Sequence, residues 1–461
     1  MNEFFTLTDL RMDLAYPFLF LILAALVLLL CVAFCKLSSK FYLSSSLWAL
    51  LVSFFLSLSN VNAFGLQSRA FFGTLNNDIV AFCAICVILL FSFLYLLMDK
   101  QEHRGEFYTL FLFMIASLML MVSSSNLALI FIGLEASSLA LYTLIAMQGS
   151  KNAISSALKY FSVAAVGSGF FVLASALIYA QTGSLSIRVF FHYAEESILL
   201  SGSKTLILVL CAIKLSLAPF HFWLRDVYYA SNSNLAAFIS VVPKIAILVV
   251  LLRIFSFYPH GAIVICALAI FSMLVAALAA LAQKDAKKML AYSSVVQSSL
   301  LVLAMVPIFL HAEYVEKGIN SALFLVFGYW VLFAFANYGL FLILSLFEKS
   351  DFNSLNNLFA KNPIVAFALA TCVLSLAGVA PFGLFWGKFM IFQTLILSKW
   401  WYCALVVALT SVLMLGSYLR LIIHGFFVKS EANFTLKLHP RQKFVLIVCV
   451  LVNIFALLLM L

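Results

Sequence analysis

The chain has 461 residues, of which 66% are hydrophobic and only 10% are charged. This composition excludes a soluble globular protein and indicates a polytopic membrane protein. The formal net charge of +10 indicates membrane topology and contact with anionic lipids, and it does not indicate nucleic-acid binding.

Apolar runs separated by charged or polar clusters predict the membrane spans. A helix needs about 20 mostly apolar residues to cross the hydrocarbon layer. By this measure the chain forms about fourteen spans, and the predicted fold class is an all-α polytopic membrane protein. The expected spans are 15–35, 43–62, 76–98, 107–122, 126–147, 159–181, 204–223, 235–256, 261–282, 290–309, 321–347, 363–396, 401–425 and 444–461. The fourth and fifth of these are separated only by the polar segment 123–126.

The lysines and arginines between the spans predict the orientation. Most of them fall in one set of alternate loops, which is therefore expected to be cytoplasmic. The other set carries fewer, among them Arg69, Arg188, Lys317 and Lys399. Both termini should then lie on the periplasmic side of a bacterial inner membrane. No cleavable signal peptide is expected, because the acidic Glu3, Asp9 and Asp13 precede the first apolar run and no basic segment does.

Four charged residues lie deep inside predicted spans, away from their ends: Glu135, Lys214, Lys244 and Lys388. A lysine or aspartate at the membrane centre costs roughly 2.5 to 3.5 kcal/mol on insertion scales, so such residues are functional candidates. Burial disfavours the charged form of lysine, and a nearby carboxylate favours it. A buried lysine whose glutamate partner approaches or withdraws is thus a switchable proton site. Glu135 and Lys214 are the expected pair, Lys244 the next station and Lys388 the outlet station.

Two segments of the chain repeat the same landmarks. Pro219 and Pro381 each follow an alanine, precede a phenylalanine and lie 162 residues apart. The same offset relates Glu135 to Gln297, and small polar residues follow both. Two landmarks at one offset indicate a duplication. If each copy has an odd number of helices, such as five, the copies insert with opposite orientation as inverted repeats.

The duplication predicts a division of the chain into four parts. A three-helix segment spans 1–98, the first inverted repeat 107–256, the second 261–425, and a C-terminal helix 442–461. Each repeat should contain a helix broken by its proline, because proline removes a backbone donor and clashes with the preceding turn. Broken helices inside a membrane protein expose backbone groups that water satisfies, and ion routes form there.

Several other polar residues have weaker signals. His221 could relay protons, although a histidine bonded to a freed carbonyl is an equally good interpretation. Gln297 cannot ionise, so only a hydrogen-bonding or water-orienting role is open to it. Arg253 and Arg420 lie near helix ends and are expected to extend their charges to the membrane surface. The nine cysteines all fall in predicted helices, which favours packing over a disulfide framework or a metal site.

An ordered set of motifs resembles the antiporter-like subunits of respiratory complex I. The matching segments are Gly133-Leu134-Glu135, Leu158-Lys159-Tyr160-Phe161, Lys214 with Ala218-Pro219-Phe220-His221-Phe222-Trp223, Asp226-Val227-Tyr228, Val242-Pro243-Lys244, Asp285-Ala286-Lys287-Lys288, Leu290-Ala291-Tyr292-Ser293-Ser294, and Pro381 with Gly387-Lys388-Phe389. Together they cover about residues 107 to 390. Two departures are Gln297, where many relatives have histidine, and Ser231-Asn232-Ser233-Asn234, which replaces a stretch usually rich in proline.

The resemblance implies fourteen helices in two inverted repeats and proton translocation driven by quinone reduction in other subunits. It implies roles for Glu135, Lys214, Lys244 and Lys388. The chain would be a non-redox subunit of a proton-translocating NADH:quinone oxidoreductase, with no catalytic cofactor and no metal of its own. NADH, FMN, iron–sulphur clusters and quinone would bind in partner subunits, and its partners would be antiporter-like and quinone-site membrane subunits and membrane lipids.

Two other functions fit the same residues. One is a free-standing or Mrp-type cation/proton antiporter, whose family resembles this one in the same motifs. It should exchange sodium for protons when purified alone in liposomes. The other is a structural membrane subunit whose charges only hold helices together. In that case charge-neutral variants should lose assembly whenever they lose pumping.

Overall fold

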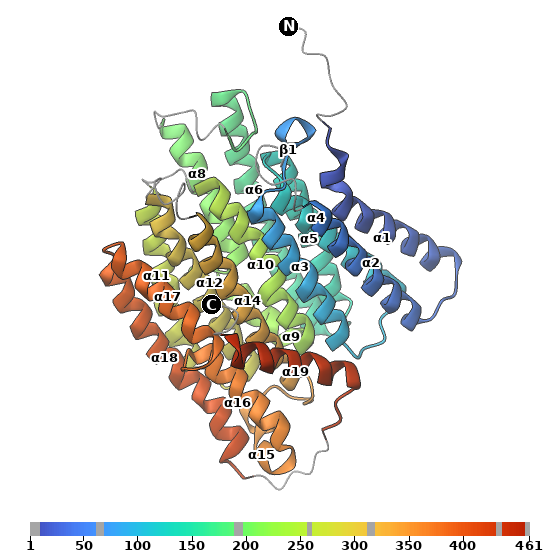
Figure 1. Ribbon diagram of the computed structural model, residues 1–461, viewed down its shortest axis with the longest axis vertical. Coiled ribbons are helices and arrows are strands. Elements are labelled where there is room, and N and C mark those ends of the chain that lie inside the picture. The colour runs from blue at the N-terminus through green and yellow to red at the C-terminus, as the bar shows by residue number, and fades with distance from the viewer. Residues whose placement is uncertain are drawn as a thin grey trace. The chain divides into compact units, whose positions relative to one another are not determined.

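The computed structural model describes residues 10–60, 69–188, 197–255, 261–310, 319–429 and 436–456. The sequence expectations for Glu3, Asp9 and Lys317, and for the ends of some spans, including 457–461, lie outside these ranges. Figure 1 shows that the described chain is almost entirely helical. A single antiparallel hairpin, β1 (Arg69–Ala70) with β2 (Leu75–Asn76), is the sheet in this part.

The helices follow the apolar runs of the sequence. The α-helices are α1 (Tyr16–Phe34), α2 (Ser39–Ser59), α3 (Ile79–Met98), α4 (Gly105–Ser123), α5 (Leu127–Ala146), α6 (Lys151–Thr182), α8 (Ile198–Leu215), α9 (Phe222–Ala230), α10 (Ser233–Phe255), α11 (Ala262–Leu281), α12 (Ala286–Leu310), α14 (Ile319–Leu344), α15 (Leu358–Lys361), α16 (Pro363–Ala377), α17 (Gly383–Leu397), α18 (Trp401–Phe426) and α19 (Pro440–Ile454). Short 3₁₀ turns are η2 (Met12–Ala15), η5 (Phe71–Gly73) and η7 (Phe352–Leu355).

Twelve helices in the described part are long and apolar enough to cross a membrane. Two shorter apolar helices, α16 and α17, together occupy the expected span 363–396. The polar segment 123–126 separates α4 from α5, as predicted. The chain is thus a multi-span helical membrane protein.

Both proline-broken helices are present. α8 ends at Leu215, and α9 begins only at Phe222, with Pro219 between them. Likewise α16 ends at Ala377 and α17 begins at Gly383, with Pro381 in the interruption. The peptide bonds Ala218–Pro219 and Ala380–Pro381 are cis. The sequence prediction of two broken helices is confirmed.

The described chain forms two compact units. The first comprises Met1–Leu96, Gln101–Lys214 and Val242–Phe257, and the second comprises Leu97–Lys100, Leu215–Val241 and Tyr258–Leu461. In the first unit α1 packs against α2 and α4, α4 against α5, and α5 against α6 (Figure 1). In the second, α11 packs against α12 and α18, and α14 against α16, α17 and α19. The boundaries of the two units fall inside α8 and α10 rather than between helices.

Helix faces are sorted between the protein interior and the lipid. Along α18 the apolar side chains Leu405, Leu409 and Val412 are more than half exposed, and they are spaced three or four residues apart. Residues with this spacing form one helix face. On the other face Val407, Met414 and Tyr418 are buried. One face of α18 is therefore packed inside the protein, and the opposite face is exposed and apolar.

Candidate proton-translocation site

Close packing of α4 on α5 places the residues around Glu135. A Cβ atom added to Gly133 would lie 2.7 Å from the carbonyl oxygen of Ser117, so only glycine lets the two helices approach this far. Two residues later comes Glu135, followed by Ser137 and Ser138. Both serines donate to the Leu134 carbonyl oxygen, at 3.0 and 2.6 Å. Their hydroxyl protons are therefore committed, and their lone pairs face outward as acceptors.

Lys214 lies in the last turn of α8 and is only 6% exposed. Its Nζ donates to Ser138 Oγ at 2.6 Å and to Tyr142 OH at 3.3 Å. The rings of Tyr142 and Tyr160 lie 5.7 Å from the same nitrogen. The C-terminal end of a helix also carries partial negative charge, which favours a cation there. The ammonium group is thus stabilised by neutral oxygens, aromatic rings and a helix end.

Glu135 does not form an ion pair with Lys214 among the described residues. Its carboxylate instead accepts a hydrogen bond from the Ser168 hydroxyl of α6. Glu135 and Ser138, the serine that binds Lys214, lie about one helical turn apart on α5. The two charged groups are therefore close in the fold, but each is held by a different serine. Each partner has a neutral bond that it can exchange for the other.

A small cavity adjoins Lys214. Its volume is about 20 Å³, and its walls include Ser137, Ser138, Tyr160 and, from α10, Pro243. A cavity of this size accommodates about one water molecule when polar partners are present. The next residue along α10 is Lys244, which is 2% exposed. On the α10 side the wall is formed by the apolar Pro243 and Ile247, so the polar groups of the cavity come from α5, α6 and α8.

Lys388, on α17, contacts the end of the neighbouring half-helix α16. Its Nζ donates to the carbonyl oxygens of Leu376 and Ala377, at 3.1 and 3.0 Å. α16 closes through Gly378, whose φ of +80° suits glycine. A Cβ atom there would also lie 2.7 Å from Cδ of Lys388. The helix break therefore creates the acceptors that hold this lysine.

Gln297 belongs to a network of hydroxyl groups in the second unit. Its Oε1 accepts a hydrogen bond from Tyr329, and its Nε2 donates to Tyr418 OH at 3.4 Å. Tyr418 also bonds to Ser293. The amide can accept from one tyrosine while donating to the other, so it orients a chain of polar groups without ionising. This arrangement agrees with the hydrogen-bonding role expected for a glutamine.

His221 caps the start of α9 and is 7% exposed. Its ring stacks on Phe222, with centroids 4.5 Å apart, and lies near Tyr292. The buried Nδ1 has no hydrogen-bond partner in the part of the chain that the structure describes. Within the described residues, Nδ1 therefore does not make the hydrogen bond to a backbone carbonyl that a purely structural histidine would make.

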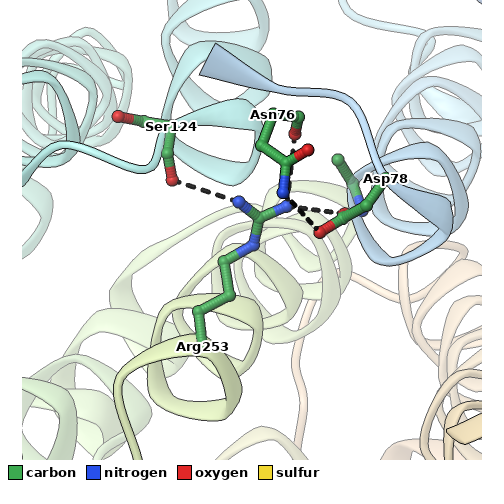
Figure 2. Close-up of polar contacts among 5 residues, drawn as sticks. Asn76, Asp78, Ser124 and Arg253 are labelled. Carbon is green, nitrogen blue, oxygen red and sulfur yellow. Dashed lines mark hydrogen bonds and ion pairs between the residues drawn. The ribbon is translucent and has the colours of Figure 1, made fainter. Parts of the chain in front are cut away.

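Arg253 and Arg420 are both bonded to nearby turns and helix ends. Arg253, near the end of α10, pairs with Asp78 at 2.7 Å and donates to the carbonyl oxygens of Ser124 and Asn76 (Figure 2). Arg420 donates to the carbonyl oxygens of Ala280 and Gln283 at the end of α11. The sequence did not predict these partners, although both arginines lie near helix ends as expected.

Sequence reasoning missed two groups of contributors to the site. One is the neutral residues Ser138, Tyr142 and Ser168, because serine and tyrosine in an apolar helix have no signature of their own. The small segment Gly167-Ser168-Gly169 was the available signal. A Cβ atom at Gly167 would lie 3.1 Å from Ile213 of α8, so α6 packs closely there. The other is the anchor made by Arg253 and Asp78.

A protein-family model described as NADH:quinone oxidoreductase/Mrp antiporter, transmembrane, matches residues 124–414. The curated NADH-quinone oxidoreductase subunit N of Campylobacter jejuni (strain RM1221) is 58% identical over 466 residues, covering 100% of both chains. The chain belongs to the NADH:quinone oxidoreductase/Mrp antiporter family. Asp226-Val227-Tyr228 and the lysine at 388 make the sequence most like subunit N within that family, and the name of this relative confirms the resemblance.

Solved structures of the NADH:quinone oxidoreductase/Mrp antiporter family share the fold. A chain of respiratory complex I from Thermus thermophilus, solved with bound aureothin, matches with a TM-score of 0.83 at 27% identity, covering 96% of this chain and 98% of that one. A chain of the Mrp complex from Dietzia sp. DQ12-45-1b matches with a TM-score of 0.81 at 20% identity, covering 93% and 82%. The second likeness concerns the fold alone.

Proposed function

We propose that this chain translocates protons as a membrane subunit of an NADH:quinone oxidoreductase of the complex I type. The observation that carries the proposal is the environment of Lys214. It is a buried lysine at the end of a broken helix, bonded to neutral hydroxyls beside a cavity of about 20 Å³. A lysine with a permanent carboxylate partner would hold its charge, whereas one held by neutral groups can give up its proton.

Glu135 acts as the switch in this proposal. When its carboxylate leaves Ser168 and approaches Lys214, the ammonium form gains an opposite charge at close range, and a proton is taken up. When the carboxylate returns to Ser168, Lys214 keeps only Ser138 and Tyr142, and the proton passes to water in the adjoining cavity. The direction of transfer follows from which side that water reaches at each stage.

Lys244 receives the proton next. It is the residue after Pro243, which lies in the wall of the same cavity. In the second repeat the route leads to Lys388 as the outlet station. It passes the network of Gln297 and two tyrosines, and then the helix break at Pro381. His221, whose Nδ1 is buried, is a candidate relay at the first break. Support for the duplicated route comes from the paired breaks at Pro219 and Pro381 and from the common offset of Glu135 and Gln297.

The wider architecture follows the same proposal. The chain would have fourteen membrane helices in two inverted repeats, 107–256 and 261–425, in a bacterial inner membrane with both termini periplasmic. Antiporter-like and quinone-site subunits would be its partners, together with membrane lipids. NADH, FMN, iron–sulphur clusters and quinone would be bound by other subunits, so this chain contributes to the enzyme without carrying its redox chemistry.

Replacing Lys214 by alanine in the assembled enzyme tests the proposal. Membrane vesicles with equal amounts of complex should keep quinone reduction in the presence of an uncoupler but lose most proton uptake, and Lys388→Ala should behave alike. Lys399→Ala, in the turn after α17, is the matched control and should pump normally. Wild-type proton uptake by Lys214→Ala vesicles would contradict the proposal. If both lysine variants fail to assemble, the structural-subunit alternative is favoured instead.

Purification in mild detergent distinguishes the antiporter alternative, since the description of the matching family model includes Mrp antiporters. Co-purification of iron–sulphur and quinone-site subunits supports the complex I assignment. The isolated chain in liposomes should then show no exchange of sodium for protons. Exchange by the isolated chain would favour a free-standing or Mrp-type antiporter.

A further inference from the structure

Two cysteine thiols are in contact inside the second unit. Cys266 lies in the second turn of α11 and Cys403 in the first turn of α18, and their Sγ atoms are 3.4 Å apart. Both residues are buried, at 6% and 4% exposure. We propose that these thiols form a reversible disulfide that joins α11 to α18. This site is independent of the proton route described above.

The separation of the two sulfurs is small enough for bond formation. A disulfide bond is about 2.05 Å long, so the sulfur atoms must approach by about 1.4 Å. A change of this size is within the range of side-chain rotation combined with a small shift of either helix. α11 and α18 already pack against one another in the second unit. The thiols can therefore meet without a rearrangement of the helices.

The surroundings of the pair place it close to the membrane surface. Trp401 and Tyr402 begin α18, are 54% and 66% exposed, and precede Cys403 directly. Exposed tryptophan and tyrosine at the end of a spanning helix are typical of the interface between lipid and water. The thiols therefore lie within about one helical turn of that interface, where a small uncharged oxidant has a short path. In the proposed orientation this end faces the periplasm, an oxidising compartment.

Hydrogen peroxide is the oxidant class that suits this buried pair. One S–H can donate to the other sulfur, which favours thiolate character on the acceptor. The acceptor sulfur attacks one peroxide oxygen, the O–O bond breaks, and a sulfenic acid and one water form. The second sulfur then displaces the sulfenic oxygen, which leaves with the remaining thiol proton as a second water. Overall two thiols lose two electrons and one peroxide becomes two waters, and a dithiol reductant reverses the change.

Mass spectrometry of the assembled enzyme in membranes tests the proposal. After peroxide treatment and alkylation of free thiols, a peptide pair linked through Cys266 and Cys403 should increase at least tenfold and should disappear after dithiothreitol. It should be absent from both Cys266→Ser and Cys403→Ser. The matched control is Cys372→Ser, another buried thiol of the second unit, which should leave the linked pair unchanged.

The exposed thiol of Cys35 reports whether the oxidant has reached the protein. If Cys35 is oxidised while Cys266 and Cys403 are both recovered as alkylated free thiols, the proposal is overturned. Linkage of either thiol to a different cysteine would overturn it as well. Alanine variants at the same two positions repeat the test if the serine variants fail to assemble.

Discussion

Neutral hydroxyl groups hold both members of the charged pair in the first unit. Ser168 donates to Glu135, and Ser138 accepts from Lys214. Neither bond cancels a charge, because a hydroxyl supplies only a dipole. A buried charge that is solvated only by dipoles remains responsive to a second charge nearby. In the proposed mechanism the two serines keep Glu135 and Lys214 available for exchange, and a permanent salt bridge would not.

Removing the Ser168 hydroxyl should disturb this balance. In Ser168→Ala the carboxylate loses a bond to a charged group, which is worth about 1.5–3 kcal/mol. Glu135 should then stay with Lys214, and proton uptake by vesicles should fall about tenfold or more, as this energy implies. Ser168→Thr keeps the hydroxyl and should restore pumping. Ser162→Ala, an exposed serine of α6, is the control, and equal uptake by all three variants would exclude the positioning role.

Glu135 itself gives a graded series. Glu135→Gln should abolish pumping, whereas Glu135→Asp, with the charge kept but withdrawn by one methylene, should retain part of it. Glu135→Gln removes a negative charge from the region of the buried Lys214, so the glutamine variant should also be less stable. The double variant with Lys214→Met removes both charges and should restore assembly without restoring proton uptake. Recovered uptake in the double variant would mean that the pair is a structural clamp.

Gln297 tests whether the second repeat conducts through water. In Gln297→Ala a water can replace the amide between Tyr329 and Tyr418, so substantial pumping should remain. In Gln297→Leu an apolar side chain of similar size excludes that water and leaves the Tyr329 hydroxyl without the acceptor that Gln297 supplied, and pumping should be lost. Proton uptake by vesicles at equal complex content separates the two. An equal loss in both variants would argue that the amide itself is required.

At the scale of elements, the far end of α10 is anchored to the loops of the first unit. Arg253 lies nine residues after Lys244 and connects α10 to Asp78, which also caps the first turn of α3 through the Ala81 N–H at 2.8 Å. The same guanidinium bonds to the turn between α4 and α5 (Figure 2). The helix that carries Lys244 is thereby tied at one end to two other helices.

Breaking this anchor should destabilise the chain. Arg253→Met should lower the free energy of unfolding by about 1–3 kcal/mol, because Asp78 loses a partly buried charged partner. Asp78→Asn should cost a comparable amount, and the double variant should cost less than the sum if the two side chains act together. Thermal unfolding of the detergent-purified protein measures all three. Simple additivity would show that the contact contributes nothing.

Most of the membrane fold could be predicted from the sequence, since apolar runs of spanning length leave few alternatives. Pro219 and Pro381 marked both helix breaks correctly, whereas Pro243 and Pro307 lie inside continuous helices. The partners of the charged residues could not be predicted. Arg253 bonds to Asp78 at a sequence separation of 175 residues. Glu135 bonds to Ser168 instead of Lys214. Such choices depend on how helices distant in sequence are rotated against one another, which the local pattern does not contain.

At the scale of the whole molecule, the contact between Lys388 and the end of α16 makes the solvation of the lysine charge depend on the relative position of two half-helices. The amine is held by carbonyls at 3.0 and 3.1 Å that belong to another half-helix. Sliding α17 along α16 by one residue, about 1.5 Å, would change both of these distances. A movement transmitted from a neighbouring subunit would then change how well the ammonium charge is solvated. In the proposed function, displacement of α17 relative to α16 would cause Lys388 to release its proton.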